Sequence, residues 1–143
     1  FHSHYHWKND NELLIFSAYD IVNRQDGLWV FTDCTDKAVR LPEPNPNKDI
    51  HCFYSPNRRY IMGDGYPDAE GYRWLHFIDT KTNTDTILGK YKSYINTNAD
   101  VDYRCDLHAR FDPTGRYVSF DSIHTGHRTV CIIDLAELDG YEY

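Results

Sequence analysis

The chain has 143 residues, a normal length for one domain, with 41% hydrophobic residues, 15% aromatic residues and a formal net charge of −7. The negative charge, and the lack of any block of five like charges, argue against a protein that binds the phosphate backbone of nucleic acid. No run of about 18 apolar residues suggests a membrane span. The four cysteines show no CxxC spacing, which argues against a zinc ribbon or a thioredoxin-type motif.

Three copies of one strand pattern follow one another along the chain. The first copy has a short strand ending at Trp7 and further strands expected at 13–17, 28–31 and 37–41. The second has a strand ending at Tyr54 and further strands at 60–64, 74–78 and 84–89. The third has a strand ending at Phe111 and further strands at 117–121 and 129–133. Polar turns with Pro, Asn and Gly separate these runs, as strand-forming sequences require.

Short antiparallel strands repeating in groups of four predict an all-β chain of β-propeller blades. No segment keeps a helical period of 3.6 for twelve residues. We expect about three four-stranded blades, at residues 1–47, 48–104 and 105–143. Because a closed propeller needs at least about four blades, we expect a fragment of a larger propeller, completed by other blades of a parent chain or by another chain.

Three histidines stand at the same place in the three copies: His4, His51 and His108, separated by 47 and 57 residues. A side chain that recurs at one point of a repeat recurs at one point relative to the axis, so these imidazoles are expected to converge. Converging imidazoles are suited to metal binding. The alternative is that each histidine is a structural blade residue that bonds a neighbouring strand.

Asp106 and His108 are two residues apart, and on a strand their side chains would project to the same face. Together with His51 of the preceding blade they form a predicted three-point metal site. Imidazole and carboxylate ligands suit Mn, Fe, Ni or Zn and are a poor match for Ca or Mg. Since the ligands must be deprotonated, binding should weaken below about pH 6.

Charged residues near these histidines are candidates for substrate contacts. Arg104 and Arg110 could each pair with a substrate carboxylate, with a plain surface salt bridge as the alternative. His6 lies at the same blade end and is a further substrate-binding candidate. Asp64 and Asp121 end equivalent strands, where a turn-capping role is expected.

Two turns resemble those of TolB-like propellers: Pro56-Asn57-Arg58-Arg59-Tyr60-Ile61 and Asp112-Pro113-Thr114-Gly115-Arg116-Tyr117-Val118. More narrowly, nearly the whole chain resembles the C-terminal half of the oligogalacturonate lyase family of seven-bladed propellers. Three features carry this resemblance: Ser3-His4-Tyr5-His6-Trp7, His51 before the Ser55-Pro56 turn, and Arg104-Cys105-Asp106-Leu107-His108 before the Asp112-Pro113 turn.

That family cleaves pectin-derived oligogalacturonates by β-elimination, with a manganese-type ion held by three His and one Gln. The resemblance implies that His51 and His108 are metal ligands and that His4 occupies the position of an active-site His. The chain departs from the family at Asp106, where another His is expected, and near Tyr103, where the Gln position falls. The Arg that acts as the catalytic base in that family would fall before Phe1.

The combined prediction is a metal-dependent, lyase-like protein that acts on oligogalacturonate or related uronate oligosaccharides. Its predicted residues are His4 and Arg104 in catalysis, His6 and Arg110 in substrate binding, and the metal ligands His51, Asp106 and His108, with Mn as the cofactor. The predicted partner is an anionic oligosaccharide, with no nucleic acid and no membrane. One alternative is a non-catalytic TolB-like propeller that binds a protein or glycan. Another is a hydrolase with Asp64 or Asp121 as its acid.

Overall fold

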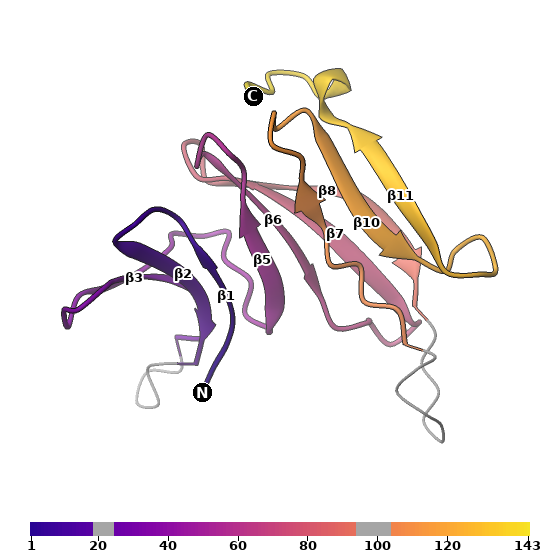
Figure 1. Cartoon of the computed structure of the whole chain (residues 1–143). Coiled ribbons are helices and arrows are strands. Elements are labelled where there is room, and N and C mark those ends of the chain that lie inside the picture. Colours follow the sequence, from indigo (N-terminus) through magenta and orange to yellow (C-terminus); the bar gives the residue numbers. More distant parts are fainter. Residues whose placement is uncertain (19–24, 94–103) are drawn as a thin grey trace.

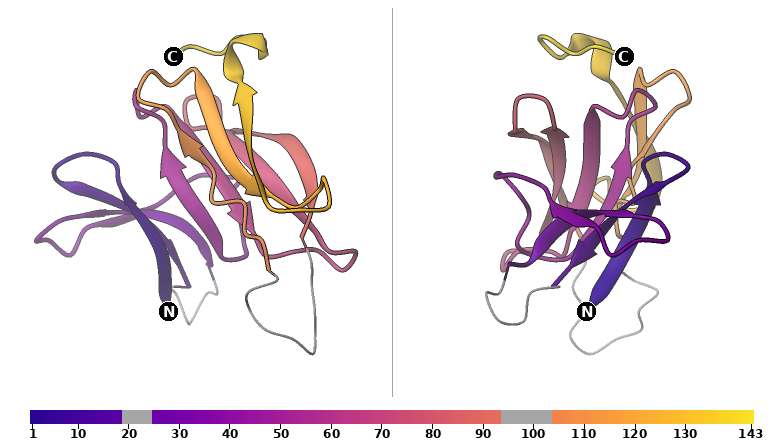
Figure 2. Two further views of the ribbon diagram at one scale, coloured as in Figure 1. Left: turned by 45° about the vertical axis from the view of Figure 1, so that its right-hand side comes forward. Right: turned by 90° about the vertical axis from the view of Figure 1, so that its left-hand side faces the viewer.

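The computed structural model describes residues 1–18, 25–93 and 104–143. Within these ranges the chain forms eleven strands in three antiparallel sheets. The sheets follow one another in a row, in the order of the sequence (Figures 1 and 2). The described residues include no helix long and apolar enough to span a bilayer. The predicted all-β architecture is confirmed.

The strand bounds follow the three sequence repeats. The first sheet has the order β1 (His2–Trp7), β2 (Glu12–Ser17), β3 (Gly27–Thr32) and β4 (Ala38–Arg40). The second has the order β5 (Ile50–Tyr54), β6 (Tyr60–Gly65), β7 (Tyr72–Asp79) and β8 (Thr84–Lys92). The third joins β9 (Arg110–Phe111), β10 (Tyr117–Ser122) and β11 (Thr129–Asp134), and the 3-10 turn η2 (Leu135–Glu137) follows it. Three strands are described in this sheet, one fewer than in the others.

An ion pair recurs at the same place in the second and third sheets. The arginine that follows the first turn of the repeat reaches the aspartate at the end of the third strand. Nη2 of Arg59 lies 2.7 Å from Oδ2 of Asp79, and Nη2 of Arg116 lies 2.7 Å from Oδ2 of Asp134. The hydrogen bonds from Arg59 lower the pKa of Asp79 to about 2. This pair fastens the turn to the neighbouring strand end in both repeats.

The core consists of two apolar clusters, one on each side of the second sheet. Side chains of the first two sheets form one cluster: Leu14, Phe16, Leu28, Val30, Ile50, Cys52, Tyr54, Ile61 and Ile78. Side chains of the second and third sheets, with the segment before β9 and with η2, form the other: Tyr60, Met62, Leu75, Phe77, Leu107, Ala109, Val118, Phe120 and Leu135. Because the second sheet is covered on both faces, β6 is buried over Tyr60–Asp64 without alternation.

The strands β1, β5 and β9 each form one edge of their own sheet, and these edges lie next to one another, with β5 between β1 and β9. We call this side of the structure the inner edge of the sheets. Near this edge two histidines have a left-handed backbone, with φ of 49° at His4 and 44° at His108. At His4 the pairing of β1 with β2 shifts register between Ser3 and Tyr5, as it does at a β-bulge. A bulge re-aims a side chain relative to the regular alternation of a strand. The repeat therefore turns its histidines by local irregularity as well as by symmetry.

Leu14→Ala is expected to destabilise the protein by about 2–5 kcal/mol, because it leaves a cavity in the cluster between the first two sheets. Val39→Ala in the same sheet is the control, since Val39 is 66% exposed and its truncation should cost less than about 0.5 kcal/mol. Urea unfolding of both variants measures the difference. Equal midpoints for the two variants would contradict the assignment of this core.

Candidate functional site

The three repeated histidines form a row along the inner edge of the three sheets. The ring centroids of His4 and His51 are 4.2 Å apart, and those of His51 and His108 are 4.3 Å apart. Each sheet contributes one imidazole, from β1, from β5 and from the segment that leads into β9. The structure thus brings together the three residues that the repeat placed at equivalent positions.

His51, Asp106 and His108 each offer one ligand atom, and these three atoms lie within 4.8 Å of one another. Two ligands at about 2.1 Å from a shared ion are at most about 4.2 Å apart, so a small inward movement is enough for all three to reach one ion. Two imidazoles and a carboxylate fit a first-row transition metal such as Mn or Zn. The three residues therefore fit a metal ion of this kind, and metal binding itself stays a prediction.

The backbone that carries Asp106 and His108 differs from the expectation. The strand β9 begins only at Arg110, and residues 104–109 are irregular. The prediction that Asp106 and His108 alternate along one strand was therefore wrong. Contacts to neighbouring strands place the segment instead: the amide of Leu107 donates to Oδ2 of Asp64 at 3.0 Å, and the carbonyl oxygen of Leu107 accepts from the amide of Asp121 at 2.8 Å.

Carboxylates orient two of the three imidazoles. Nδ1 of His4 lies 2.9 Å from Oδ1 of Asp49, which also accepts a 2.6 Å hydrogen bond from the hydroxyl of Ser3. Nδ1 of His51 lies 3.3 Å from Oδ2 of Asp64. A carboxylate that accepts the Nδ1 proton fixes the ring and its tautomer, and it leaves the Nε2 lone pair for a metal or a proton.

Asp64 does not cap a turn, so the turn-capping role predicted for it was wrong. It lies within β6 and is 1% exposed. Its Oδ2 accepts a hydrogen bond from the amide of Leu107 and lies within hydrogen-bond distance of Nδ1 of His51. Its Oδ1 is buried and has no hydrogen-bond partner among the described residues. Because Asp64 is almost fully buried and its Oδ2 is held by His51 and Leu107, it is placed to fix the His51 ring, which argues against Asp64 as the acid of a hydrolase.

Arg73 is the main residue of the site that the sequence analysis missed. It lies in β7, is 1% exposed, forms an ion pair with Oδ1 of Asp106 and donates to the carbonyl oxygen of Gly65. Its Nε donates to the hydroxyl of Ser93 at 3.2 Å. Burial lowers the pKa of Arg73, and the charges of Asp106 and Asp64 oppose that shift. The sequence did contain a sign of this burial: Arg73 alternates with Leu75 and Phe77 along one strand, so its side chain points to the same buried face.

Two arginines share the carboxylate of Asp106, and they differ in burial. Arg73 holds Oδ1 from inside the protein, whereas Nη2 of Arg104 lies 2.9 Å from Oδ2 and the Arg104 side chain is 45% exposed. Exposed ion pairs contribute about 0–1 kcal/mol. Removal of one partner from a buried pair costs about 3–5 kcal/mol, because the other charge stays buried and unpaired. The contact with Arg73 is therefore the persistent one, and the contact with Arg104 is the weak one.

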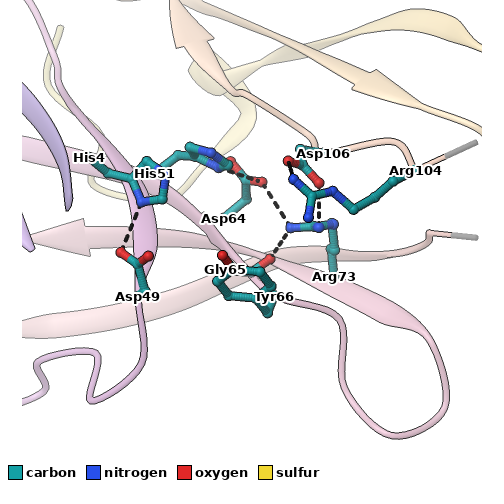
Figure 3. Close-up of a pocket in the computed structure, with 9 residues that line it drawn as sticks. All are labelled: His4, Asp49, His51, Asp64, Gly65, Tyr66, Arg73, Arg104 and Asp106. Atoms are coloured by element: carbon teal, nitrogen blue, oxygen red, sulfur yellow. Dashed lines mark hydrogen bonds and ion pairs between the residues drawn. The ribbon is translucent and has the colours of Figure 1, made fainter. Parts of the chain in front are cut away.

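These residues line one pocket (Figure 3). It has about 240 Å³ of empty space, including its open side, and its lining residues are His4, Asp49, His51, Asp64, Gly65, Tyr66, Arg73, Arg104 and Asp106. Figure 3 shows the arginines on the opposite side of the pocket from His4. Tyr66 is 58% exposed and presents an aromatic ring within reach of a ligand. Of the predicted catalytic residues, both His4 and Arg104 line this pocket.

The two predicted substrate-binding residues lie outside the lining of this pocket. Nδ1 of His6 accepts a 3.2 Å hydrogen bond from the amide of Tyr54, at the contact of the first two sheets. The guanidinium of Arg110 lies 3.5 Å from the centre of the Phe53 ring. Arg110 lines a separate open hollow that His108 and Asp121 share. Their roles in substrate binding stay predictions.

The site favours a neutral imidazole at His108. Burial is the main cause that lowers the pKa of His108, the charge of His51 adds to it, and the carboxylates of Asp64 and Asp106 oppose it. The pKa of His6 is also lowered, first by burial and then by Arg58 and Arg110. Neutral imidazole is the form that binds a metal.

The free energy of unfolding should therefore fall as the pH drops below about 6.5, when the protein is measured in the presence of a chelator. A histidine with a lowered pKa binds fewer protons in the folded state than in the unfolded chain, so stability rises with pH through this range. His108→Gln should flatten the slope, and the contribution of His6 should remain. Denaturant unfolding at several pH values measures the pH dependence of the unfolding free energy. An unchanged slope in His108→Gln would refute His108 as its cause.

No protein-family profile matches the chain, and no curated protein sequence matches it. Its structure is similar to the crystal structure of TolB from Acinetobacter baumannii, with a TM-score of 0.71 and 12% sequence identity. The match covers 96% of this chain and 30% of TolB, so the chain spans about a third of the length of that protein. At this identity the likeness concerns the fold alone. The β-propeller blades predicted from the repeats, and the TolB-like fold that the resemblance of two turns implied, are confirmed, while the narrower resemblance to oligogalacturonate lyases stays a prediction.

Proposed function

We propose that the chain carries the metal site of a lyase-like protein that cleaves oligogalacturonate or a related uronate oligosaccharide by β-elimination. The observation that carries the proposal is the cluster of ligand atoms from His51, Asp106 and His108. His51 and Asp106 line the pocket together with Arg104, whose guanidinium lies beside Asp106. The sequence resemblance to the lyase family supports the same choice of substrate. Mn is the proposed metal, in line with the imidazole and carboxylate ligands.

A bound divalent metal supplies a Lewis acid that neutralises the uronate carboxylate and acidifies the proton on the adjacent carbon. His51 and His108 would hold it through ring nitrogens, and Asp106 through a carboxylate oxygen. Asp64 fixes the His51 ring, and the deep ion pair with Arg73 fixes Asp106. Arg104 is the residue that would bind the substrate carboxylate, because a guanidinium matches it with two parallel hydrogen bonds.

His4 is the proposed base within this chain. Asp49 holds its Nδ1, so the Nε2 lone pair is the one that would take the proton. The electron pair of the broken C–H bond then forms the carbon–carbon double bond, and the glycosidic oxygen leaves from the next carbon. The reaction consumes no water and yields an unsaturated uronate.

The second candidate is a non-catalytic TolB-like propeller that binds an anionic glycan or protein. The observation in its favour is the charge balance at Asp106, where each carboxylate oxygen already faces a guanidinium. In that case the histidines are structural and the pocket binds an anion through its arginines. Glycan binding without turnover would favour this candidate.

His51→Ala and His108→Ala should each weaken Mn binding by more than about 10–100-fold, the usual cost of losing only an outer partner of a metal ligand. The matched control is His76→Ala, because His76 pairs with Asp85 at 2.7 Å and does not line the pocket. Calorimetric titration of Mn into the purified chain measures this. The metal site is refuted if the wild-type chain binds no Mn at neutral pH.

Lyase activity should appear as ultraviolet absorbance of an unsaturated uronate when the protein is mixed with polygalacturonate and Mn. His4→Ala should abolish the signal while Mn binding persists, since His4 lies outside the cluster of ligand atoms. A neutral galactan is the substrate control, because it lacks the carboxylate that acidifies the proton. Activity that survives in His4→Ala would remove His4 from the mechanism and leave the metal site intact.

A further inference from the structure

The carboxylate of Asp106 is fully occupied by the protein's own cations. Arg73 faces Oδ1 and Arg104 faces Oδ2. The same carboxylate belongs to the cluster of metal-ligand atoms with His51 and His108. A cation bound at that cluster must therefore share Asp106 with two guanidinium groups of the same sign, and repulsion favours the loss of one of them.

The structure decides which arginine stays. Arg73 is almost completely buried, and it is also held by the carbonyl oxygen of Gly65 and by the hydroxyl of Ser93. If it left Asp106, its charge would remain inside the protein without that counter-ion. Arg104 has no such constraint. Its side chain is nearly half exposed, and Asp106 is its one side-chain partner in the described part of the chain.

We propose that Arg104 is an exchangeable counter-ion of Asp106, which a bound cation displaces and thereby makes available to a carboxylate ligand. The proposal rests on the proposed metal site and adds an order of binding to it. Before the cation arrives, Asp106 occupies the guanidinium of Arg104. After it arrives, Asp106 serves the cation and Arg73, and Arg104 is free to pair with an incoming anion in the same pocket.

The released guanidinium of Arg104 determines which class of ligand would bind. A guanidinium favours a planar carboxylate, which it can bind through two hydrogen bonds. Arg104 lines the pocket together with Tyr66 and His4, so the released group stays within reach of the same ligand. Since binding free energies are linked, the cation must tighten carboxylate binding by the factor by which the carboxylate tightens cation binding.

The first test is calorimetric titration of Mn into wild type, Arg104→Gln and Arg110→Gln. Arg104→Gln should bind Mn about 2–5-fold more tightly, because the competing ion pair is gone. Arg110→Gln removes an equal charge beside His108, where Arg110 donates to the His108 carbonyl oxygen, and it leaves the Asp106–Arg104 ion pair intact, so it separates exchange from a general field effect. An equal gain in both variants, or none in Arg104→Gln, overturns the exchange.

The second test titrates galacturonate into each protein with and without Mn, with galactose as the neutral control. In wild type, Mn should tighten galacturonate binding at least about 5-fold and leave galactose unchanged. In Arg104→Gln this gain should shrink to less than half. If the gain is undiminished in Arg104→Gln, the galacturonate carboxylate interacts with the metal alone, which would overturn the role of Arg104.

The two proposals fail in different ways. Wild type that binds no Mn overturns both the metal site and the exchange. Wild type that binds Mn, loses it in His51→Ala and shows no effect of Arg104→Gln retains the metal site and overturns the exchange alone.

Discussion

The candidate site depends on the ion pair between Arg73 and Asp106. Arg73 belongs to the second sheet, and Asp106 belongs to the irregular segment that leads into the third. Residues 104–109 belong to no strand, so a buried charge pair and two hydrogen bonds of Leu107 hold them in place: its amide donates to Asp64, and its carbonyl oxygen accepts from the amide of Asp121. Without them, nothing in the local backbone would bring Asp106 and His108 next to His51.

Buried ion pairs contribute little to stability compared with apolar residues of the same size, and their recognised use is to fix one arrangement among several. That is the role here. If stability alone were required here, Arg73 and Asp106 could both be replaced by well-packed apolar side chains, whereas removal of Arg73 alone would leave a buried carboxylate unpaired. With arginine, the carboxylate of Asp106 has a fixed position, and a second cationic group is left at the pocket surface as a weaker partner.

The fold is a poor guide to what the pocket does. A likeness to TolB at 12% identity describes how the strands are arranged, and one propeller scaffold serves many unrelated functions. The chemistry instead comes from the inner edge of the sheets. There, left-handed backbone at His4 and His108 turns two imidazoles, and carboxylates at Asp49 and Asp64 fix two rings. Strained backbone of this kind persists where the surrounding structure determines it, and it is common at functional sites.

The sequence by itself determined the strands, the three repeats and the convergence of His4, His51 and His108, because the periodicity of apolar residues and turns is local and symmetry carries a repeated residue to a repeated place. It also named Asp106 as the companion of His51 and His108, although through a strand alternation that the backbone does not have. Only the tertiary structure decided the roles of Arg73 and Asp64. Their partners lie 33 and 43 residues further along the chain, at Asp106 and Leu107, and no local pattern records a charge that is neutralised across two sheets.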